Sequence, residues 1–245
     1  EMTFSAASLI KIPILVHAIK LASQDAFPLD REVIVRNITS VKGAGVLRHL
    51  HDGLVLTMKD LLTLMIIVSD NTATNMVIDL LGMDGVNETS KELGIKNSFL
   101  RRRMMDRTAI EQGIDNTCTA SDMTNLLLKI AHREAVGEHW DDIMLQILRA
   151  QQFGDRLDLI LPSDVMIANK TGARTGIVHD CGIITTSKFS YSICVLTSDL
   201  KSNGHGVMAV AEISRHIYNY VSCNVDDTCR PISSLLYEEN EENIS

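Results

Sequence analysis

Residues 57–82 read TMKDLLTLMIIVSDNTATNMVIDLLG and contain two apolar segments on either side of a short polar one. The stretch opens with a capping-box pattern, TMKD, which predicts a helix over residues 61–68. A second apolar helix is predicted over residues 72–81, and the glycine that follows is placed to end it. The polar segment Ser69-Asp-Asn71 therefore lies at a break between two helices.

Upstream of this stretch, residues 8–21 are apolar on nearly every side, which predicts a helix that is buried all round. Lys11 is the exception, and it either extends to the surface or is held in a polar pocket, because burying an unpaired ammonium is costly. Ser8 and Lys11 are three residues apart, so they share a helix face and the amine can reach the hydroxyl. Ser8 also lies at the predicted N-terminus, where backbone N–H groups favour a developing oxyanion.

Downstream, the apolar period changes from that of helices to that of strands. Residues 101–119 have no apolar period and are predicted to form a long loop. Beyond residue 161, three short strands are separated by Gly, Asp and Ser, and the short turns between them make the strands antiparallel. The elements predicted here are helices over residues 123–131 and 141–150, strands over residues 165–170, 181–186 and 190–198, and a closing helix over residues 206–221.

This order of elements predicts an α+β fold, with a helical subdomain and an antiparallel sheet flanked by helices. Residues 8–155 are expected to form the helical subdomain. Residues 1–7 and 156–223 are expected to form the sheet subdomain, and residues 224–245 an acidic tail.

Length and composition exclude several classes of protein. The chain has 245 residues, 45% hydrophobic and 22% charged, as in folded globular proteins. No apolar run approaches the roughly 18 residues of a membrane span, and the net charge of -8 argues against nucleic acid as a partner. The eight histidines show no HExxH motif and no paired Cys/His spacing, so no metal and no cofactor is expected.

The cysteines and the start of the chain bear on the compartment. The five cysteines are an odd number without a CxxC pair, and we expect mainly small buried thiols. Only Cys223 and Cys229, which bracket a polar turn, are placed to bridge each other. No positively charged segment followed by an apolar one opens the sequence, so we expect no signal peptide in it. The compartment stays open, either cytoplasmic or secreted after processing.

A third polar motif, Lys170-Thr-Gly172, lies at the end of a predicted strand. Lys170 and the Thr171 hydroxyl supply a positive charge and a donor for a substrate carboxylate, and Gly172 lets a ligand approach the backbone. At the break between helices, Ser69 is placed to pass a proton to a leaving nitrogen, and Asn71 to orient a substrate carbonyl.

Taken alone, each motif has an ordinary structural explanation as a helix cap or a strand end. By average composition, SxxK is expected roughly once in a chain of this size, whereas SDN and KTG are each expected only a few times in about a hundred chains. Finding all three in this order indicates a catalytic site.

From about residue 4 to residue 221 the sequence resembles the penicillin-recognising serine enzymes, most closely the class A β-lactamases, whose motifs are SxxK, SDN and KTG. The resemblance implies a β-lactamase-like fold and an acyl-enzyme mechanism without a cofactor. The residues to which it gives roles are Ser8 (nucleophile), Lys11 (its base), Ser69 (proton shuttle), Asn71 (substrate contact), Lys170 and Thr171 (carboxylate anchors), and the N–H groups of Ser8 and Ala173 (oxyanion hole).

The chain departs from the class A pattern in two places. Class A members carry Glu-x-x-x-Asn in the loop that corresponds to residues 101–119, where the glutamate positions the deacylating water, and no such motif is present. Asp106 and Glu111 are the candidates to replace it, and both also read as solvated loop acids. The strand after the KTG turn lacks the arginine that family members often place there, unless Arg174 replaces it.

We therefore expect a serine hydrolase that is acylated by β-lactams and deacylates slowly, because efficient turnover needs an aimed water. Two alternatives use the same scaffold. One is a peptidoglycan carboxypeptidase or esterase, and the other is a sensor that is acylated once and stays acylated. In each case the partner is a small molecule of β-lactam or cell-wall peptide type.

The resemblance also raises a question about the sheet edge. Family members usually have a helix and two strands before the SxxK helix, and those strands pair with the last strand, yet only seven residues precede Ser8. We expect these N-terminal strands to be missing and the strand over residues 190–198 to have a bare edge. Its segment Ile193-Cys-Val-Leu196 is apolar and uncharged, so self-association, low stability or a covering partner segment is expected.

Overall fold

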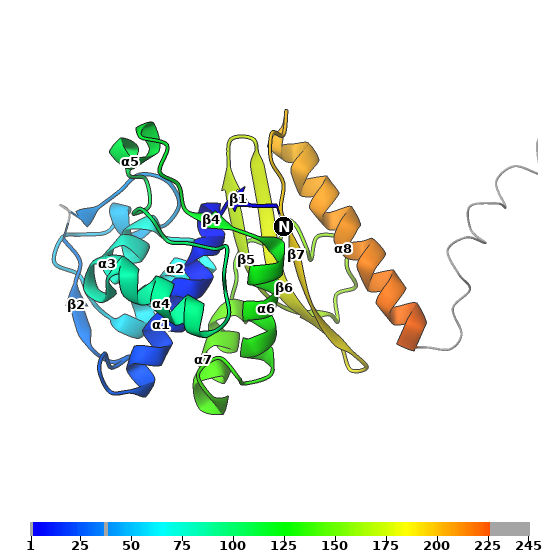
Figure 1. Ribbon diagram of the computed structural model, residues 1–245, viewed down its shortest axis with the longest axis horizontal. Coiled ribbons are helices and arrows are strands. Elements are labelled where there is room, and N and C mark those ends of the chain that lie inside the picture. The colour runs from blue at the N-terminus through cyan, green and yellow to red at the C-terminus, as the bar shows by residue number, and fades with distance from the viewer. Residues whose placement is uncertain (1, 37–38, 226–245) are drawn as a thin grey trace, which may run out of the picture.

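The computed structural model describes residues 2–36 and 39–225. Figure 1 shows a helical body on one side and a sheet covered by the last helix on the other. In chain order the helices are α1 (Lys11–Ser23), α2 (Met58–Ile67), α3 (Asn71–Leu81), α4 (Met83–Glu92), α5 (Arg107–Glu111), α6 (Ala120–Ala131), α7 (Glu138–Arg149) and α8 (Asn203–Val225). The strands are β1 (Phe4–Ser5), β2 (Glu32–Ile34), β3 (Val55–Thr57), β4 (Thr117–Cys118), β5 (Met166–Arg174), β6 (Ile177–Thr185) and β7 (Ser190–Val195).

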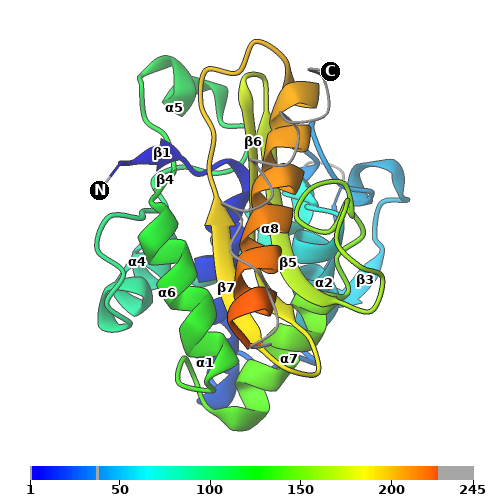
Figure 2. The ribbon, with the colours of Figure 1, turned by 90° about the vertical axis from the view of Figure 1, so that its right-hand side faces the viewer.

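The main sheet is antiparallel with the strand order β5-β6-β7. A two-residue turn joins β5 to β6, so Arg174 pairs with Ile177. Residues 186–189 join β6 to β7, where Thr185 pairs with Ser190. Figure 2 shows α8 lying across one face of this sheet, with α6 near β7. Two further pairs, β1 with β4 and β2 with β3, form separate two-stranded sheets.

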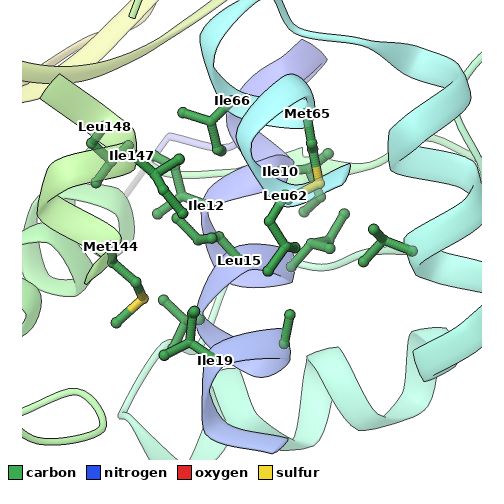
Figure 3. Packing of buried hydrophobic residues seen from close by; sticks show 14 of the residues in the cluster. Ile10, Ile12, Leu15, Ile19, Leu62, Met65, Ile66, Met144, Ile147 and Leu148 are labelled. Atoms are coloured by element: carbon green, nitrogen blue, oxygen red, sulfur yellow. The ribbon is translucent and has the colours of Figure 1, made fainter. Parts of the chain in front are cut away.

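The main core forms around α1, which is buried on nearly every side as its sequence predicts. Figure 3 shows the apolar side chains of α1 between those of α2 and α7. Ile12, Leu15 and Ile19 belong to this core and are fully buried, as are Leu62 and Leu148. A smaller core under α8 joins the outer face of the sheet to the segment around Leu157.

The predicted α+β class is confirmed, and so are several local signals. Thr57 and Asp60 form the capping box of α2, each accepting a hydrogen bond from the backbone of the other. Gly82 follows α3 with a φ of 81°, and its N–H binds the carbonyl of Ile78 at 2.8 Å. The antiparallel order of the last three strands is confirmed as well.

Three predictions about local structure are corrected. Residues 101–119 are not a continuous loop, because they contain α5 and β4, and β4 pairs with β1. Helix α4 was not predicted, since its polar sequence lacks a strong apolar period. Strands β5 and β6 run on through the polar residues that suggested breaks, and only Thr175 and Gly176 form the turn between them.

Among the residues described, none of the helices combines the length and apolar character needed to cross a bilayer.

Candidate active site

Ser8 lies in a 3-10 turn, Ala7–Ile10, that leads directly into α1. The residue before it, Ala7, has a φ of 45°, a left-handed conformation that is strained for alanine. Strand β5 lies close against this turn, because a Cβ added to Gly172 would be 3.3 Å from the backbone nitrogen of Ser8. Gly172 thus lets the Ser8 turn itself approach the strand, a packing reason that the sequence did not indicate.

Lys11 is fully buried and held in a polar pocket, which decides between the two alternatives for this side chain. Its Nζ donates to the carbonyl oxygen of Ser69 at 2.8 Å and to the Ser69 Oγ at 3.0 Å. It also donates to Oδ1 of Asn71 at 2.9 Å. Burial lowers the pKa of Lys11 well below its ordinary value, and the positive charge of Lys170 lowers it further, against the opposing carboxylate of Asp70.

The break between α2 and α3 is built by Ser69 and Asp70. Ser69 has a φ of 55°, which turns the chain sharply, and its side chain is buried. Asp70 caps α3 through the N–H of Ala73 at 3.0 Å, while its second oxygen accepts from the N–H groups of Val46 and Leu47 at 2.6 and 2.8 Å. The middle residue of the SDN motif therefore ties the segment before α2 to the site, a role that was not predicted.

The KTG strand contributes a second buried ammonium. Lys170 is fully buried, and its Nζ donates to the carbonyl of Thr171 at 2.8 Å. Burial lowers the pKa of Lys170 to about 7, with the carboxylate of Asp180 acting to raise it and the guanidinium of Arg156 acting to lower it. The charge of this group therefore changes close to neutral pH.

Asp180 on β6 is a buried carboxyl beside the same strand. It accepts two hydrogen bonds from the Asn169 amide at 2.9 and 3.0 Å and one from the N–H of Leu157 at 3.2 Å. Burial raises the pKa of Asp180 to about 7, although these hydrogen bonds and Arg156 act to lower it. The predicted strand began only at Cys181, whereas the structure places Asp180 inside β6, directly opposite Thr171 of the KTG motif.

A cleft of about 300 Å³ opens above these groups. It brings together Ser8, Ser69, Thr171 and Ala173, all of which were candidates from the sequence. Lys11 and Lys170 lie beneath it as buried side chains. The other residues that line the cleft are Ala44, Phe153, Asp155 and Arg156.

Arg156 is the clearest residue that the sequence missed. Its Nη1 lies 3.0 Å from a carboxylate oxygen of Asp155, and its side chain is about nine-tenths buried. Within the described residues, Nε has no hydrogen-bond acceptor, and the contact of Nη1 with Asp155 is an ion pair without hydrogen-bond geometry. The charge of this buried guanidinium is therefore balanced by one half-exposed carboxylate.

The residues proposed to replace missing family groups lie elsewhere. Arg174 is half-exposed at the end of the hairpin, where its Nη1 lies 3.3 Å from Asp115. Asp106 caps α5 by accepting from the N–H of Ala109 at 3.0 Å, and Glu111 is exposed in the last turn of that helix. Neither acid is among the residues that line the cleft.

The segment that carries Asp106 and Glu111 is held in place by contacts on either side of α5. Arg102 and Asp115 form an ion pair at 2.7 Å. Asn75 of α3 holds the backbone of Met104 from both sides, donating to its carbonyl at 3.0 Å and accepting from its N–H at 2.7 Å. These contacts fix the start of the segment next to α3 and leave α5 projecting outward (Figure 1).

No group of three or more His, Cys, Asp or Glu side chains in the described part of the chain is arranged to hold a metal ion.

Comparison with known proteins decides the family. Residues 1–221 match the family described as the beta-lactamase enzyme family. The chain belongs to this family. Among solved structures, the beta-lactamase from Sphaerobacter thermophilus is 33% identical, with a TM-score of 0.85 over 94% of this chain and 86% of that one. The sequence has no significant match among curated proteins.

Two other solved structures have the same fold. PBP-A is 28% identical, with a TM-score of 0.82 over 91% of this chain and 83% of that one. The TLA-1 extended-spectrum beta-lactamase is 21% identical, with a TM-score of 0.83 over 90% of this chain and 86% of that one, and it shows the fold alone. Membership in this family makes the chain a hydrolase of β-lactamase type, and the resemblance inferred from the three motifs is confirmed.

Proposed function

We propose that this β-lactamase-family protein forms an acyl-enzyme on β-lactams through Ser8 and releases it slowly. The observation that carries the proposal is the buried Lys11, whose Nζ binds the Ser69 hydroxyl on the floor of the cleft that Ser8 lines. Burial lowers the pKa of this amine, which favours the neutral, proton-accepting form.

In the proposed reaction the Ser8 Oγ attacks the lactam carbonyl carbon while Lys11 takes its proton. The N–H groups of Ser8 and Ala173 stabilise the oxyanion. The carbon–nitrogen bond then breaks, and the proton returns from Lys11 through the Ser69 hydroxyl to the leaving nitrogen. Water hydrolyses the ester in a second step.

The proposed substrate contacts surround this path. Asn71 is held by Lys11 on one side, and its amide nitrogen donates to the carbonyl of Lys42 at 3.3 Å on the other, so its orientation is fixed. The Thr171 hydroxyl and the Lys170 ammonium offer a donor and a charge to a substrate carboxylate. Arg156 lines the same cleft and adds a second positive charge there, in place of the arginine missing from β6.

Slow release follows from the position of the carboxylates. A deacylating water needs a base within hydrogen-bond reach, and the loss of one typically costs about 10² to 10⁴ in rate. Asp106 is engaged as the cap of α5, and Glu111 is exposed at its end. Asp155 does line the cleft, but its carboxylate is paired with Arg156 and half-exposed.

A second candidate, a protein that is acylated by β-lactams or cell-wall peptides with little turnover, is favoured by a specific likeness. A PBP-A mutant that is 27% identical to this chain was solved as an acyl-enzyme complex with penicillin G, with a TM-score of 0.80. Turnover of a simple ester or a D-alanyl peptide beside a chromogenic cephalosporin separates a hydrolase from such a sensor, and it also tests the carboxypeptidase or esterase alternative.

The direct test is intact-mass analysis after brief exposure to benzylpenicillin. We expect one adduct on the native protein and none on Ser8→Ala. Lys11→Ala should slow adduct formation by about 10² or more, because the base is lost. Lys20→Ala is the matched control, since Lys20 is on the same helix but is partly exposed and paired with Glu92. An adduct of equal yield on Ser8→Ala would refute the proposal.

A further inference from the structure

Three cysteines that are far apart in the sequence lie close together in the structure. Cys181 of β6 and Cys194 of β7 are directly opposite each other in the antiparallel register. Cys118 of β4 is buried nearby, close enough to influence the titration of Cys181. Cys118 and Cys181 are buried and Cys194 is half-buried.

The hydrogen-bond alternation along the hairpin fixes the kind of pair that Cys181 and Cys194 form. The hairpin closes with the N–H of Thr186 donating to the carbonyl of Phe189 at 2.9 Å. Hydrogen-bonded and non-hydrogen-bonded pairs alternate from there, and the cysteine pair lies five pairs further along. It is therefore a non-hydrogen-bonded pair, in which the side chains approach most closely.

That geometry meets the requirement for a disulfide. Opposite residues of a non-hydrogen-bonded pair have Cα atoms about 4.5 Å apart, and disulfides join Cα atoms that are about 4.4 to 6.8 Å apart. The Cys194 thiol acts to raise the pKa of the Cys181 thiol, as expected of two side chains that lie side by side. A bond between the sulfur atoms therefore needs no separation of the two strands.

We propose that Cys181 and Cys194 form a reversible redox site, a dithiol that oxidises to a cross-strand disulfide. The short Cα separation lies at the lower end of the disulfide range, which leaves such a bridge strained and readily reduced. On the neighbouring strand, Lys170 is directly opposite Cys181, so the bridge would form in the same row of the sheet as the KTG lysine.

The chemistry requires an external oxidant, and a small-molecule disulfide supplies it. The Cys194 thiol is the more accessible, so it loses its proton and attacks one sulfur of that disulfide, whose S–S bond breaks to release a thiolate. Cys181 then gives up its proton and attacks the sulfur of Cys194, and a second thiolate leaves. Two protein thiols are oxidised, and one external disulfide is reduced to two thiols.

The test treats the reduced, folded protein with 2-hydroxyethyl disulfide and then alkylates the remaining thiols after denaturation. We expect the count of reactive thiols to fall by two, and a mass about 2 Da below that of the reduced protein before alkylation. Peptide mapping should show Cys181 joined to Cys194, and dithiothreitol should restore both thiols.

Two variants make the outcome specific. Cys118→Ser should retain the bridge, because Cys118 is near the pair but not opposite either member of it. Cys194→Ser should abolish the bridge, and a melting curve shows whether that variant is folded. The proposal is overturned by an unchanged thiol count, by a bridge that includes Cys118, or by a mixed disulfide on Cys194 that Cys181 never resolves. None of these readouts depends on acylation of Ser8.

Discussion

At the residue scale, the two buried lysines of the cleft have opposite requirements. Lys11 must be neutral to accept a proton, whereas Lys170 must be charged to attract a carboxylate. Burial lowers the pKa of both, that of Lys170 to about 7. Acylation by a carboxylate-bearing penicillin should therefore rise with pH as Lys11 loses its proton, and fall above about pH 7 as Lys170 loses its charge.

The rate of adduct formation measured against pH checks this prediction. A neutral ester without a carboxylate does not need the Lys170 charge, so its acylation should keep the rising limb and lose the falling one. An identical falling limb on both substrates would show that Lys170 does not recognise the carboxylate.

Arg156 gives the second prediction at this scale. Arg156→Gln removes the positive charge of a residue that lines the cleft, and hydrogen bonds to charged groups contribute about 1.5 to 3 kcal/mol. The second-order rate of acylation by penicillins should fall by about 10 to 100 fold, while that of a neutral ester changes little.

Arg174→Gln is the matched control for Arg156→Gln. Arg174 is half-exposed, paired with Asp115 and not among the residues that line the cleft, so its loss should matter less. If the Arg174 variant lost more penicillin reactivity than the Arg156 variant, the assignment of the second cationic contact would be reversed.

These residues also mark the limit of what the sequence predicts about the site. The motifs point to Ser8, Ser69 and Lys170 because three short patterns occur in one order. Arg156 belongs to no pattern, and only its burial beside the cleft identifies it. Asp70 lies inside a motif, yet its contacts with Val46 and Leu47 depend on a loop that closes over 20 residues away in sequence.

At the element scale, the segment with α5 decides how fast the acyl-enzyme is released. Because Asp106 caps α5 and does not line the cleft, Asp106→Asn should leave the lifetime of the penicillin adduct unchanged. Asp155 lines the cleft, but its carboxylate is paired with Arg156, so Asp155→Asn should also leave the lifetime unchanged. Product should appear as a burst equal to the enzyme present, followed by a slow steady state. Stopped-flow absorbance and adduct mass against time provide the measurement.

If Asp106→Asn or Asp155→Asn lengthened the adduct lifetime by about 10²-fold or more without slowing adduct formation, the substituted residue would be the deacylating base. Asp106→Ala serves as a control for the cap, because it removes the acceptor for the N–H of Ala109 and so affects α5 itself.

Helices with a strong apolar period were predictable, and segments with polar contacts were not. The limits of α2 and α3 follow from a capping box and a glycine that act locally. By contrast, β4 exists because it pairs with β1, more than 100 residues away in sequence. The predicted strand began only at residue 181, but partners from other elements satisfy two polar residues inside β6. His179 Nε2 lies 2.9 Å from the Ser5 carbonyl, and the N–H of Leu157 donates to Asp180.

At the scale of the whole molecule, the sheet ends at β7 within the described residues. Strand β7 carries no charged residue, as its sequence indicates. Hydrogen-bonded and non-hydrogen-bonded pairs alternate along the hairpin, so the N–H groups of Tyr191, Ile193 and Val195 point toward β6. The N–H of Ser192 therefore points away from the sheet. Nearby, α8 exposes Ile213, Ile217 and Tyr220 on successive turns.

An unpaired apolar edge beside an exposed apolar stripe favours pairing between copies. We expect the apparent mass in light scattering to rise with protein concentration. Ser192→Pro should suppress this rise, because proline removes the outward N–H without breaking the ladder to β6. Ser192→Ala is the control, since it loses the side-chain contact with the Thr124 carbonyl but keeps the N–H, and it should associate as the native protein does. A constant monomer mass for the native protein, with a single cooperative melting transition, would show that the edge of β7 is not an association site.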